Sequence, residues 1–465
     1  MTGRTESASP RRMEPTALAV AGVASLSGFL LGYNTGIIAP TLDPLSAAFD
    51  LGTMAQQIVA TSILLGGMVG AIASGPLTRR YGQRPVLICG GLIYLVFAVG
   101  CAASPNFALL VASRTCLGLA VGISSMATPL YVGETSPMRR RGAFVSLIQL
   151  FITLGILVSY LVGYAVSDEA WRSMFALGGV GGIVMAATMI LLPESPRWLF
   201  LQGRSEEALG SLTRLLGPAA GQAEFRAIEA SMSEDEGNWS DLLGRRIRPV
   251  LIVAAMMFAF QNLSGIDAII YYSPKIFSIA GFEGRSAQLL STMGIGAINV
   301  LATIVSLWLV DRVGRRPLLI GGLVPMTLAM AALALSLHLG GPETGYAAVA
   351  SLAVFVAFFA ISLGPLPFVL MAEIFPLRVR SLGMSVAASS LWILNMAVTL
   401  TFLSLLETVG SPGTFLLFSA ICAVALVFAY RTVPETRGRS LEAIEANVEA
   451  GVPTRLLGSD RVSGG

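Results

Sequence analysis

Charged residues are scarce in this sequence of 465 residues. They make up 12% of the chain, against 54% hydrophobic residues, whereas an ordinary soluble domain carries about a quarter charged residues. This composition excludes a soluble globular enzyme and is typical of a protein that crosses a membrane many times. The net charge of +3 and the lack of a basic run with interleaved aromatic residues also argue against nucleic acid as a partner.

Residues that commonly hold metals or carry out catalysis are few as well. The four cysteines, Cys89, Cys101, Cys116 and Cys422, lie in apolar stretches without a CxxC motif or a neighbouring histidine. This placement favours buried thiols over disulfides or metal ligands. The one histidine, His338, falls at the outer end of an apolar stretch, and the sequence places no nucleophile-base pair or metal cluster at membrane depth. We therefore expect no metal site, no cofactor and no enzymatic activity.

Twelve apolar stretches are long enough to cross a bilayer, which takes about 20 residues of helix. They form two sets of six on either side of a polar insert. We predict an all-α membrane protein with 12 transmembrane helices, arranged as two six-helix bundles with an intracellular helical insert. The predicted parts are a tail at 1–15, a bundle at 16–192, a linker at 193–248, a second bundle at 249–432 and a tail at 433–465.

The basic residues predict which side of the membrane each loop faces, because lysine and arginine in short loops are retained in the cytoplasm. With both termini inside, the predicted cytoplasmic segments hold 26 of the 30 Lys and Arg residues. The opposite loops hold two, Arg172 and Arg285. We expect a multi-pass protein of the plasma membrane with cytoplasmic N- and C-termini.

The two halves of the chain repeat each other in three short motifs. They pair residues 80–85 with 312–317, 134–141 with 373–380, and 193–194 with 434–435. Basic loops that only enforced topology would not need to repeat glycines, prolines and glutamates as well. Parallel repeats of six helices are typical of transporters in which two bundles rock about a central site.

These motifs resemble those of the sugar porter family of the major facilitator superfamily, which holds glucose facilitators and proton-coupled xylose and glucose symporters. The resemblance covers nearly the whole chain. It is carried by GYNTG at 32–36, RYGQR at 80–84, PLYVGE at 129–134, PESPRWL at 193–199, QNLSGI at 261–266, DRVGRR at 311–316 and PETRGR at 434–439. The resemblance implies alternating-access transport of a hexose or pentose, with a sugar and the lipid bilayer as partners. A monomer can contain the whole pathway.

Polar residues inside the apolar stretches should face a cavity or a partner, because they are costly in hydrocarbon. Amides that donate and accept, beside an aromatic face, suit a sugar, although contact between helices would explain a single amide equally well. The resemblance implies sugar contacts for Gln149, Gln261, Asn262, Asn299, Trp392 and Asn395. Two more positions in this site depart from the family, with Asp267 in place of the usual Asn and Phe368 in place of a frequent Trp.

The resemblance also implies a gate. Tyr271 and Tyr272 match the extracellular gate of the family. Pro365 and Pro367, in the run Gly364-Pro365-Leu366-Pro367, predict a break in the tenth span, as a moving half-helix would need.

Charged residues at the predicted cytoplasmic ends can bias the balance between two states, each exposed ion pair by about 1 kcal/mol or less. The resemblance implies that such residues latch the outward-facing state. The candidates are Arg80, Glu134, Arg141, Glu194, Asp311, Arg316, Glu373, Arg380 and Glu435. Arg79 stands where the second copy has Asp311, so we expect a stronger latch in the C-terminal half. A solvated basic loop is the alternative for any one of these residues.

Coupling to a proton is the open question of the sequence. In proton-coupled relatives the GYNTG motif carries an Asp, which can pair with an arginine of span four. Here the two positions hold Asn34, which cannot titrate, and Arg114, so the motif favours a facilitator. Asp267, however, is a carboxylate inside an apolar span, where burial favours its neutral form and a nearby cation its ionised form. Three roles stay open for it: a strong acceptor for a sugar hydroxyl, a relocated proton carrier, or a partner that neutralises Arg114 or Lys275.

The leading prediction is facilitated diffusion of a monosaccharide. The alternatives are sugar:proton symport through Asp267, transport of an inositol or another polyol, and, from another class, a transporter-like nutrient receptor. A receptor would need a long cytoplasmic signalling extension, whereas the predicted tail at 433–465 is short. We therefore expect a transporter.

Overall fold

The computed structural model describes residues 15–136, 141–231, 239–341 and 343–459. Within these ranges the chain is all-helical and forms no strand. Eleven of the described helical segments are long and apolar enough to cross a membrane, and one bent helix pair makes a twelfth span. The predicted all-α membrane fold with twelve spans is confirmed.

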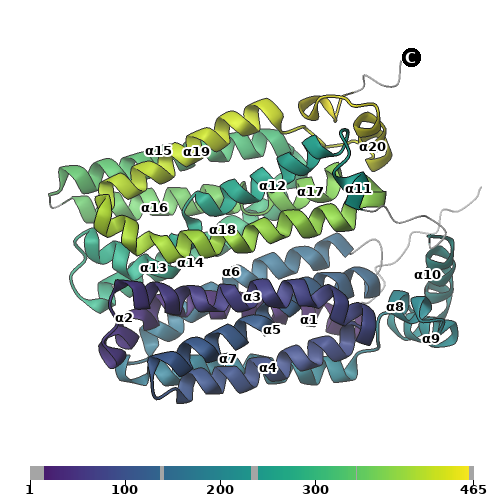
Figure 1. Ribbon diagram of the computed structural model, residues 1–465, viewed down its shortest axis with the longest axis horizontal. Helices are drawn as coiled ribbons and strands as arrows, with labels where there is room; N and C mark the ends of the chain where they lie inside the picture. Colours follow the sequence, from purple (N-terminus) through teal and green to yellow (C-terminus); the bar gives the residue numbers. More distant parts are fainter. Residues whose placement is uncertain (1–14, 137–140, 232–238, 342, 460–465) are drawn as a thin grey trace, which may run out of the picture.

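The N-terminal half forms one bundle, coloured purple to blue in Figure 1. Its first span is the bent pair α1 (Pro15–Gly36) and α2 (Ile38–Phe49), which meet at an angle of 40°. The other spans are α3 (Thr53–Tyr81), α4 (Gln83–Ala103), α5 (Phe107–Thr135), α6 (Arg141–Ala165) and α7 (Trp171–Leu191), with a short turn η2 (Asp168–Ala170) before the last.

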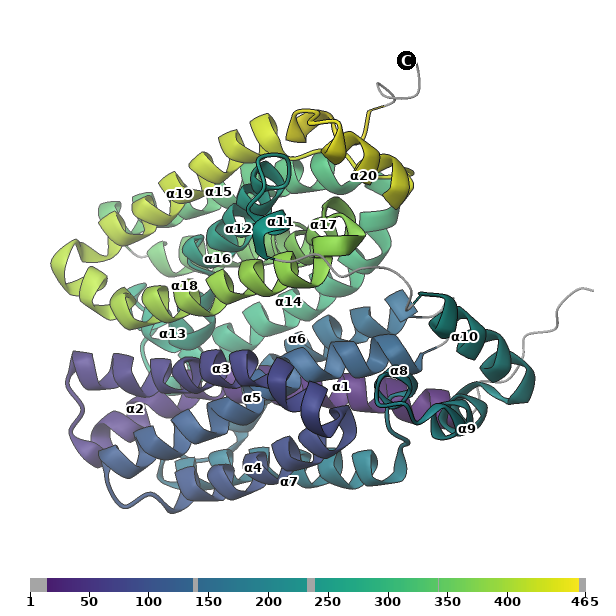
Figure 2. The same ribbon diagram turned by 45° about the vertical axis from the view of Figure 1, so that its right-hand side comes forward.

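Short helices follow the first bundle. They are α8 (Pro196–Leu201), α9 (Ser205–Leu216), α10 (Pro218–Ser231) and α11 (Trp239–Leu242). Figure 2 shows α8 to α10 at one end of the N-terminal bundle and α11 at the same end of the C-terminal bundle.

The C-terminal half forms the second bundle, coloured green to yellow. Its helices are α12 (Arg248–Leu263), α13 (Ile266–Ile279), α14 (Arg285–Val313), α15 (Arg315–Leu339), α16 (Thr344–Ile361), α17 (Leu366–Ile374), η3 (Leu377–Val379), α18 (Arg380–Thr408) and α19 (Gly410–Thr432). Two elements, α20 (Leu441–Glu449) and η4 (Thr454–Leu456), follow and pack back on this bundle.

Two spans of this bundle are broken. The predicted break in the tenth span is confirmed, because residues 362–365 separate α16 from α17. The seventh span breaks at Gly265, between α12 and α13, where the backbone has φ 91°. A side chain there would be strained, and its Cβ would lie 2.6 Å from the Phe418 ring, so the break needs a glycine.

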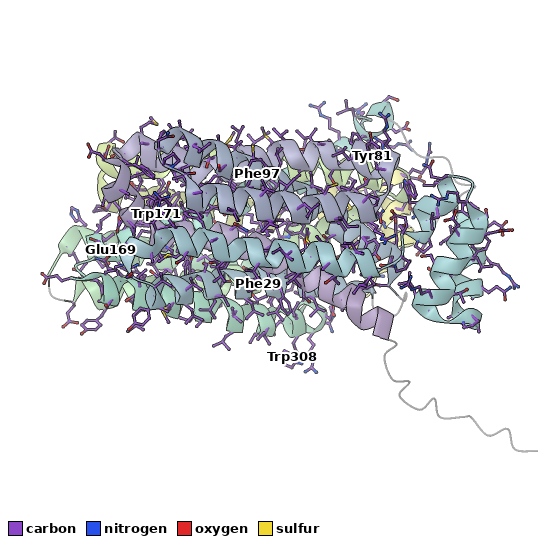
Figure 3. The ribbon with its side chains drawn as sticks, turned by 90° about the horizontal axis from the view of Figure 1, so that it is seen from below. Phe29, Tyr81, Phe97, Glu169, Trp171 and Trp308 are labelled. Carbon is purple, nitrogen blue, oxygen red and sulfur yellow. The ribbon has the colours of Figure 1, made fainter. Side chains whose placement is uncertain are left out.

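The two ends of the molecule carry different residues. Arg84, Glu194, Arg315 and Glu435 lie at what we call the basic end, where α8 to α11 and α20 also lie (Figure 2). Figure 3 shows Tyr81 at this end, with Glu169 and Trp171 at what we call the opposite end, and Trp308 projecting from the side.

The bundles pack on each other through α3 with α18 and through α6 with α14. Hydrogen bonds between them join described residues nearer the opposite end. The Ser404 hydroxyl donates to Gln57 Oε1 at 3.1 Å, the Thr53 hydroxyl donates to Glu407, Tyr160 donates to the Ile270 carbonyl at 2.8 Å, and Arg285 donates to the carbonyl oxygens of Gly163 and Val166. The opposite end is thus the end at which the bundles are tied together.

Candidate functional site

Asp267 and Asn395 form the polar centre of the C-terminal bundle. Asp267 lies in the first turn of α13 and is 8% exposed. The Asn395 side chain on α18 lies beside its carboxylate and accepts from the Thr399 hydroxyl at 3.2 Å. The second carboxylate oxygen, Oδ2, is buried and has no hydrogen-bond partner among the described residues. A buried acceptor without a donor is costly, so this atom is poised for a proton or a ligand hydroxyl.

Gln261 connects the two broken spans. Its NH2 group donates to the Gly364 carbonyl at 2.7 Å, in the break between α16 and α17. Its Oε1 atom is buried and has no partner in the described part of the chain. The neighbouring Asn262 instead donates to the Phe258 carbonyl of its own helix at 2.8 Å.

Trp392 lies at a close approach between the two bundles. Its ring is buried on α18 and faces Gly67 of α3, where an added Cβ would lie 2.3 Å from the ring. Asn299 of α14 is buried in a small cavity between the bundles, which Tyr160 and Ser273 also line. This cavity measures about 10 Å³, the lower limit for one water molecule.

Two other predicted sugar contacts, Gln149 and Phe368, lie outside the groups of residues described above. Gln149 is half-buried on α6. Phe368 on α17 is 42% exposed and packs edge-to-face on Phe258, with 4.8 Å between the ring centroids. The structure therefore brings together Asp267 with Asn395, and Gln261 with the tenth-span break. Among the described residues, no hydrogen bond or ring contact joins Gln149 or Phe368 to these groups.

The predicted gate residues Tyr271 and Tyr272 are both buried on α13. Tyr272 donates to the Thr399 carbonyl at 3.0 Å and stacks on Phe402, with centroids 5.2 Å apart. Its φ of −122° and ψ of 17° interrupt the helix. The Tyr271 hydroxyl is buried and interacts electrostatically with both Asp267 and Arg114. Pro365 and Pro367 begin the half-helix α17.

Arg114 is fully buried in the N-terminal bundle. Its Nε atom donates to the Val59 carbonyl at 3.0 Å, and its guanidinium carbon lies 5.4 Å from the centroid of the Phe175 ring. Neither NH1 nor NH2 has a partner among the described residues. Asn34, the predicted coupling position, donates to the Leu30 carbonyl of its own helix at 2.8 Å. Arg114 is thus a buried cation without a carboxylate.

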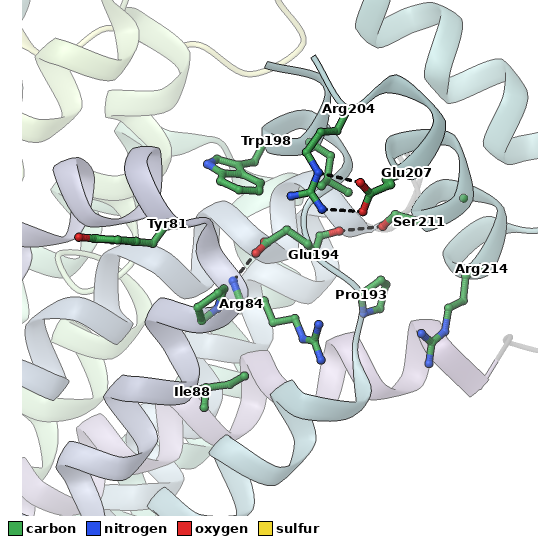
Figure 4. A pocket seen from close by; sticks show the side chains of 13 residues that line it. Tyr81, Arg84, Ile88, Pro193, Glu194, Trp198, Arg204, Glu207, Ser211 and Arg214 are labelled. Atoms are coloured by element: carbon green, nitrogen blue, oxygen red, sulfur yellow. Dashed lines mark hydrogen bonds and ion pairs between the residues drawn. The ribbon is translucent and has the colours of Figure 1, made fainter. Parts of the chain in front are cut away.

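At the basic end, the N-terminal bundle holds a cluster around two glutamates. Glu194 accepts from the backbone N–H groups of Gln83 and Arg84, both at 3.1 Å, at the start of α4 (Figure 4). A carboxylate at a helix N-terminus is stabilised by the helix dipole. Glu134 accepts from the Gln83 side chain at 2.7 Å and from the Ser195 hydroxyl.

The C-terminal bundle repeats this cluster with one difference. Glu435 accepts from the N–H groups of Arg315 and Arg316, both at 3.1 Å, at the start of α15. Glu373 accepts from the Thr436 hydroxyl at 2.5 Å and forms an ion pair with Arg315 at 2.7 Å. Arg315 also lies 3.5 Å from Asp311. Arg315 therefore occupies the place that Gln83 takes in the first copy.

The remaining predicted latch residues bind locally. Arg80 lies over the Tyr81 ring, Arg316 donates to the Tyr430 carbonyl, and Arg380 donates to the Phe375 carbonyl. Burial lowers the pKa of Arg380 from its ordinary value. The side chain of Arg141 lies outside the described residues. The pairs found at the basic end join residues of the same half, and the exception is Arg378, 3.9 Å from Asp241 on α11.

The sequence interpretation missed four members of these clusters: Gln83, Ser195, Arg315 and Thr436. The repeat itself was the available signal. Positions 83 and 315 are separated by the same 232 residues as the two arginine-rich loops, and positions 195 and 436 by the same 241 residues as the two Pro-Glu pairs.

A cavity of about 500 Å³ lies between the basic end of the N-terminal bundle and α8 and α9. Figure 4 shows Arg84, Glu194, Trp198 and Arg204 around it. Its charges bind one another or the backbone. Arg204 pairs with Glu207 at 2.6 Å, which holds the pKa of that carboxyl below its ordinary value. Trp198 donates to the Arg79 carbonyl at 2.9 Å and so fixes α8 to the end of α3.

Two six-helix bundles around buried amides, broken spans and repeated loop clusters define a transporter of the major facilitator type. The family model described as "Sugar (and other) transporter" matches residues 20–448. The chain belongs to this family, the sugar porters of the major facilitator superfamily.

Similar proteins are transporters by name. The chain is 38% identical to the "Putative metabolite transport protein YwtG" of Bacillus subtilis (strain 168), over 91% of this chain and 93% of that protein. It is 36% identical to the "Galactose-proton symporter" of Escherichia coli (strain K12), over 94% and 95% of the two chains. The inward-open structure of the xylose transporter XylE from E. coli superposes with a TM-score of 0.80 at 28% identity, covering 92% of this chain and 99% of that one.

Proposed function

We propose that the protein carries a monosaccharide, a hexose or a pentose, across the plasma membrane by alternating access. The observation that carries this proposal is the buried Oε1 atom of Gln261, which has no donor among the described residues. Because its NH2 group is held by the Gly364 carbonyl, the oxygen is fixed in place to accept from a sugar hydroxyl. Names of relatives add support, since they include a D-xylose transporter, a galactose-proton symporter and a glucose transporter.

The other predicted sugar contacts complete the proposed site. Asn262, Asn299 and Asn395 offer amides that donate and accept, and Trp392 offers an apolar face for the sugar ring. Trp392 and Gly67 belong to different bundles. Binding of a sugar against this ring would therefore depend on the distance between the two bundles. Gln149 and Phe368 would reach the sugar only after a movement of α6 or α17.

The proposed orientation places the basic end in the cytoplasm, because the basic loops cluster there. Both termini are then cytoplasmic. The bundles are tied together at the end that would face outside. The described ion pairs at the basic end stay within each half, apart from the pair of Arg378 with Asp241 on the linker helix α11. The conformation then corresponds to an inward-facing state, in agreement with the similarity to the inward-open xylose transporter.

The two bundles, at 16–192 and 249–432, would rock about the central site, with residues 193–248 as a linker between them. In the outward-facing state the basic ends would approach each other. Glu134, Glu194, Glu373 and Glu435 would then exchange part of their present contacts for partners on the other bundle, and this exchange would constitute the latch.

Ligand binding to the purified protein tests the substrate class. We expect a hexose or a pentose from a panel of D-xylose, D-galactose, D-glucose and myo-inositol to raise the melting temperature and to change Trp392 fluorescence. Myo-inositol belongs in the panel because one relative, 33% identical, is named as a myo-inositol transporter. If only myo-inositol gave a response, the proposed substrate class would change from a monosaccharide to a polyol. No response to any of the four compounds would contradict the proposal.

A further inference from the structure

We propose that Asp267 carries a proton across the membrane together with the substrate, so that the protein is a proton symporter with its carrier on the seventh span. This inference rests on the proposed sugar transport and adds a second transported species to it. The proposal places the proton carrier on α13, because the first span of this chain holds Asn34, whose amide cannot carry a proton.

The surroundings of the Asp267 carboxyl favour its neutral form in this conformation. Its side chain is 8% exposed, Oδ2 has no donor among the described residues, and the polar side chain beside it is that of the uncharged Asn395. No ion pair joins it to a described Lys, Arg or His. An ionised carboxylate buried without a counter-ion is strongly unfavourable. The group must therefore take up a proton, or face water, in each transport cycle.

The charged groups around Asp267 do not provide that counter-ion. On its own helix, Lys275 lies eight residues further along, about 12 Å away at 1.5 Å per residue. Arg114 is the buried cation across the bundle interface. Tyr271 interacts electrostatically with both Asp267 and Arg114.

The helices packed against α13 are α1, α2, α12, α14, α16 and α18. Their charged or titratable residues in the described ranges are Tyr33, Asp43, Arg248, Arg285, Asp311, Arg312, Tyr346, Arg380 and Glu407. All of the charged ones except Asp43 lie near helix ends, and Asp43 is exposed. None of them forms an ion pair with Asp267.

The N-terminal bundle lacks an alternative carrier near the centre. Asn34 keeps its amide on the Leu30 carbonyl and cannot bind or release a proton at ordinary pH. Arg114 keeps its charge and has no carboxylate to exchange with. Among the described residues near the middle of the spans, Asp267 is the carboxyl that can titrate.

The proposed step is a simple proton transfer. Water on the side to which the site is open gives a proton to Asp267 Oδ2, which forms an O–H bond. The neutral carboxyl crosses with the conformational change, and the same O–H bond breaks to return the proton to water on the other side. Asn395 links this event to the substrate, because it lies beside Asp267 and is a proposed sugar contact. If protonation strengthens sugar binding, sugar binding strengthens protonation by the same factor.

Reconstitution into liposomes tests the proposal. For the wild type with one proton per sugar, an inward gradient of one pH unit at zero membrane potential should concentrate the sugar about tenfold inside. Asp267→Asn keeps the size and one acceptor oxygen but cannot titrate, and we expect it to exchange sugar without any accumulation. Asp267→Glu should retain accumulation, and Asp43→Asn, which removes an exposed carboxylate, should behave as the wild type. Undiminished accumulation in Asp267→Asn would overturn the proposal.

Two further readouts keep the test decisive. If Asp267→Asn does not fold, addition of sugar to wild-type vesicles containing a pH-sensitive dye should acidify the lumen, and an unchanged lumen would contradict symport. Sugar exchange without a gradient tests the transport function alone. Exchange without gradient-driven accumulation would refute the proton carrier and leave sugar transport intact, whereas no exchange of any sugar would refute the proposed function itself.

Discussion

Arg315 at the start of α15 forms an ion pair with Glu373 on α17, with 2.7 Å between the guanidinium and the carboxylate. The pair is largely shielded from solvent, with side-chain exposures of 13% and 21%. In the N-terminal bundle the matching glutamate, Glu134, has the neutral side chain of Gln83 as its partner. The two repeats thus share one architecture, but among the described residues only the second copy pairs this glutamate with an arginine.

Replacement of Arg315 by glutamine should lower the stability of the protein. Loss of a shielded charge partner leaves Glu373 with the Thr436 hydroxyl as its neutral partner, and we expect a cost of about 1–3 kcal/mol. Thermal unfolding of the purified protein measures the effect. Arg204→Gln is the matched control, because its pair with Glu207 is exposed, and a loss as large as that of Arg315→Gln would contradict a special role for shielding.

The reverse exchange in the first copy should be stabilising. Gln83→Arg would place a cation beside Glu134, and we expect a gain of up to about 1 kcal/mol in the unfolding free energy. Thermal unfolding again provides the measurement. A clear loss of stability would show that the space around Gln83, which is 3% exposed, cannot accept the larger side chain.

Gly67→Ala should disturb the contact between the bundles. The new Cβ would lie 2.3 Å from the Trp392 ring, so α3 and α18 could no longer approach as they do. We expect sugar exchange in proteoliposomes to fall at least about tenfold, the equivalent of 1.4 kcal/mol. Gly75→Ala on the same helix is the control, since nothing lies within 4 Å of its added Cβ. Equal activity of the two variants would exclude this close approach from the transport cycle.

Arg285 ties the bundles together at the opposite end through the carbonyl oxygens of Gly163 and Val166. Arg285→Met should weaken the state described here by about 1–3 kcal/mol, because charged hydrogen bonds are lost. Spin labels at Glu169 and Glu343, both exposed near that end, would report a larger population with long distances. An unchanged distance distribution would count against a closing role for Arg285.

Gln261→Leu should weaken substrate binding without abolishing folding. The variant keeps the volume but loses both the bond to the Gly364 carbonyl and the free acceptor Oε1. We expect affinity for the responding sugar to fall about 10- to 100-fold, measured by fluorescence titration. Asn262→Leu should have a smaller effect, because the side-chain amide of Asn262 donates to the Phe258 carbonyl of its own helix. An unaffected affinity in Gln261→Leu would remove this residue from the site.

Much of the fold can be predicted from the sequence, because the length of each apolar stretch and the basic residues of each loop are properties of short, continuous segments. The broken tenth span was predicted from Gly364 and the two prolines that follow. The course of the first span was not, since it bends between α1 and α2 and continues to Phe49 with Pro44 inside it. The hydrogen bond between Gln57 and Ser404 links residues 347 positions apart, and no periodic pattern in the sequence predicts such a pair.

The candidate site divides in the same way. The resemblance predicted which amides lie near the centre, and Asp267 was singled out as a carboxylate in an apolar span. Its relation to Arg114 depended on three-dimensional placement, which shows the two charges unpaired. The glutamate clusters at the basic end could not be predicted in the same way. Glu194 and Glu435 accept from backbone N–H groups at the starts of α4 and α15, so a prediction would need the exact residue at which each helix begins.

Sugar counterflow tests the central claim most directly. Proteoliposomes loaded with unlabelled D-xylose, D-galactose or D-glucose would be diluted into a trace of the same labelled sugar, beside liposomes without protein. The account predicts transient accumulation of label for at least one of these sugars, and a rate at least about tenfold lower in Gln261→Leu. Label that enters protein-containing and empty liposomes at the same rate for all three sugars would contradict it.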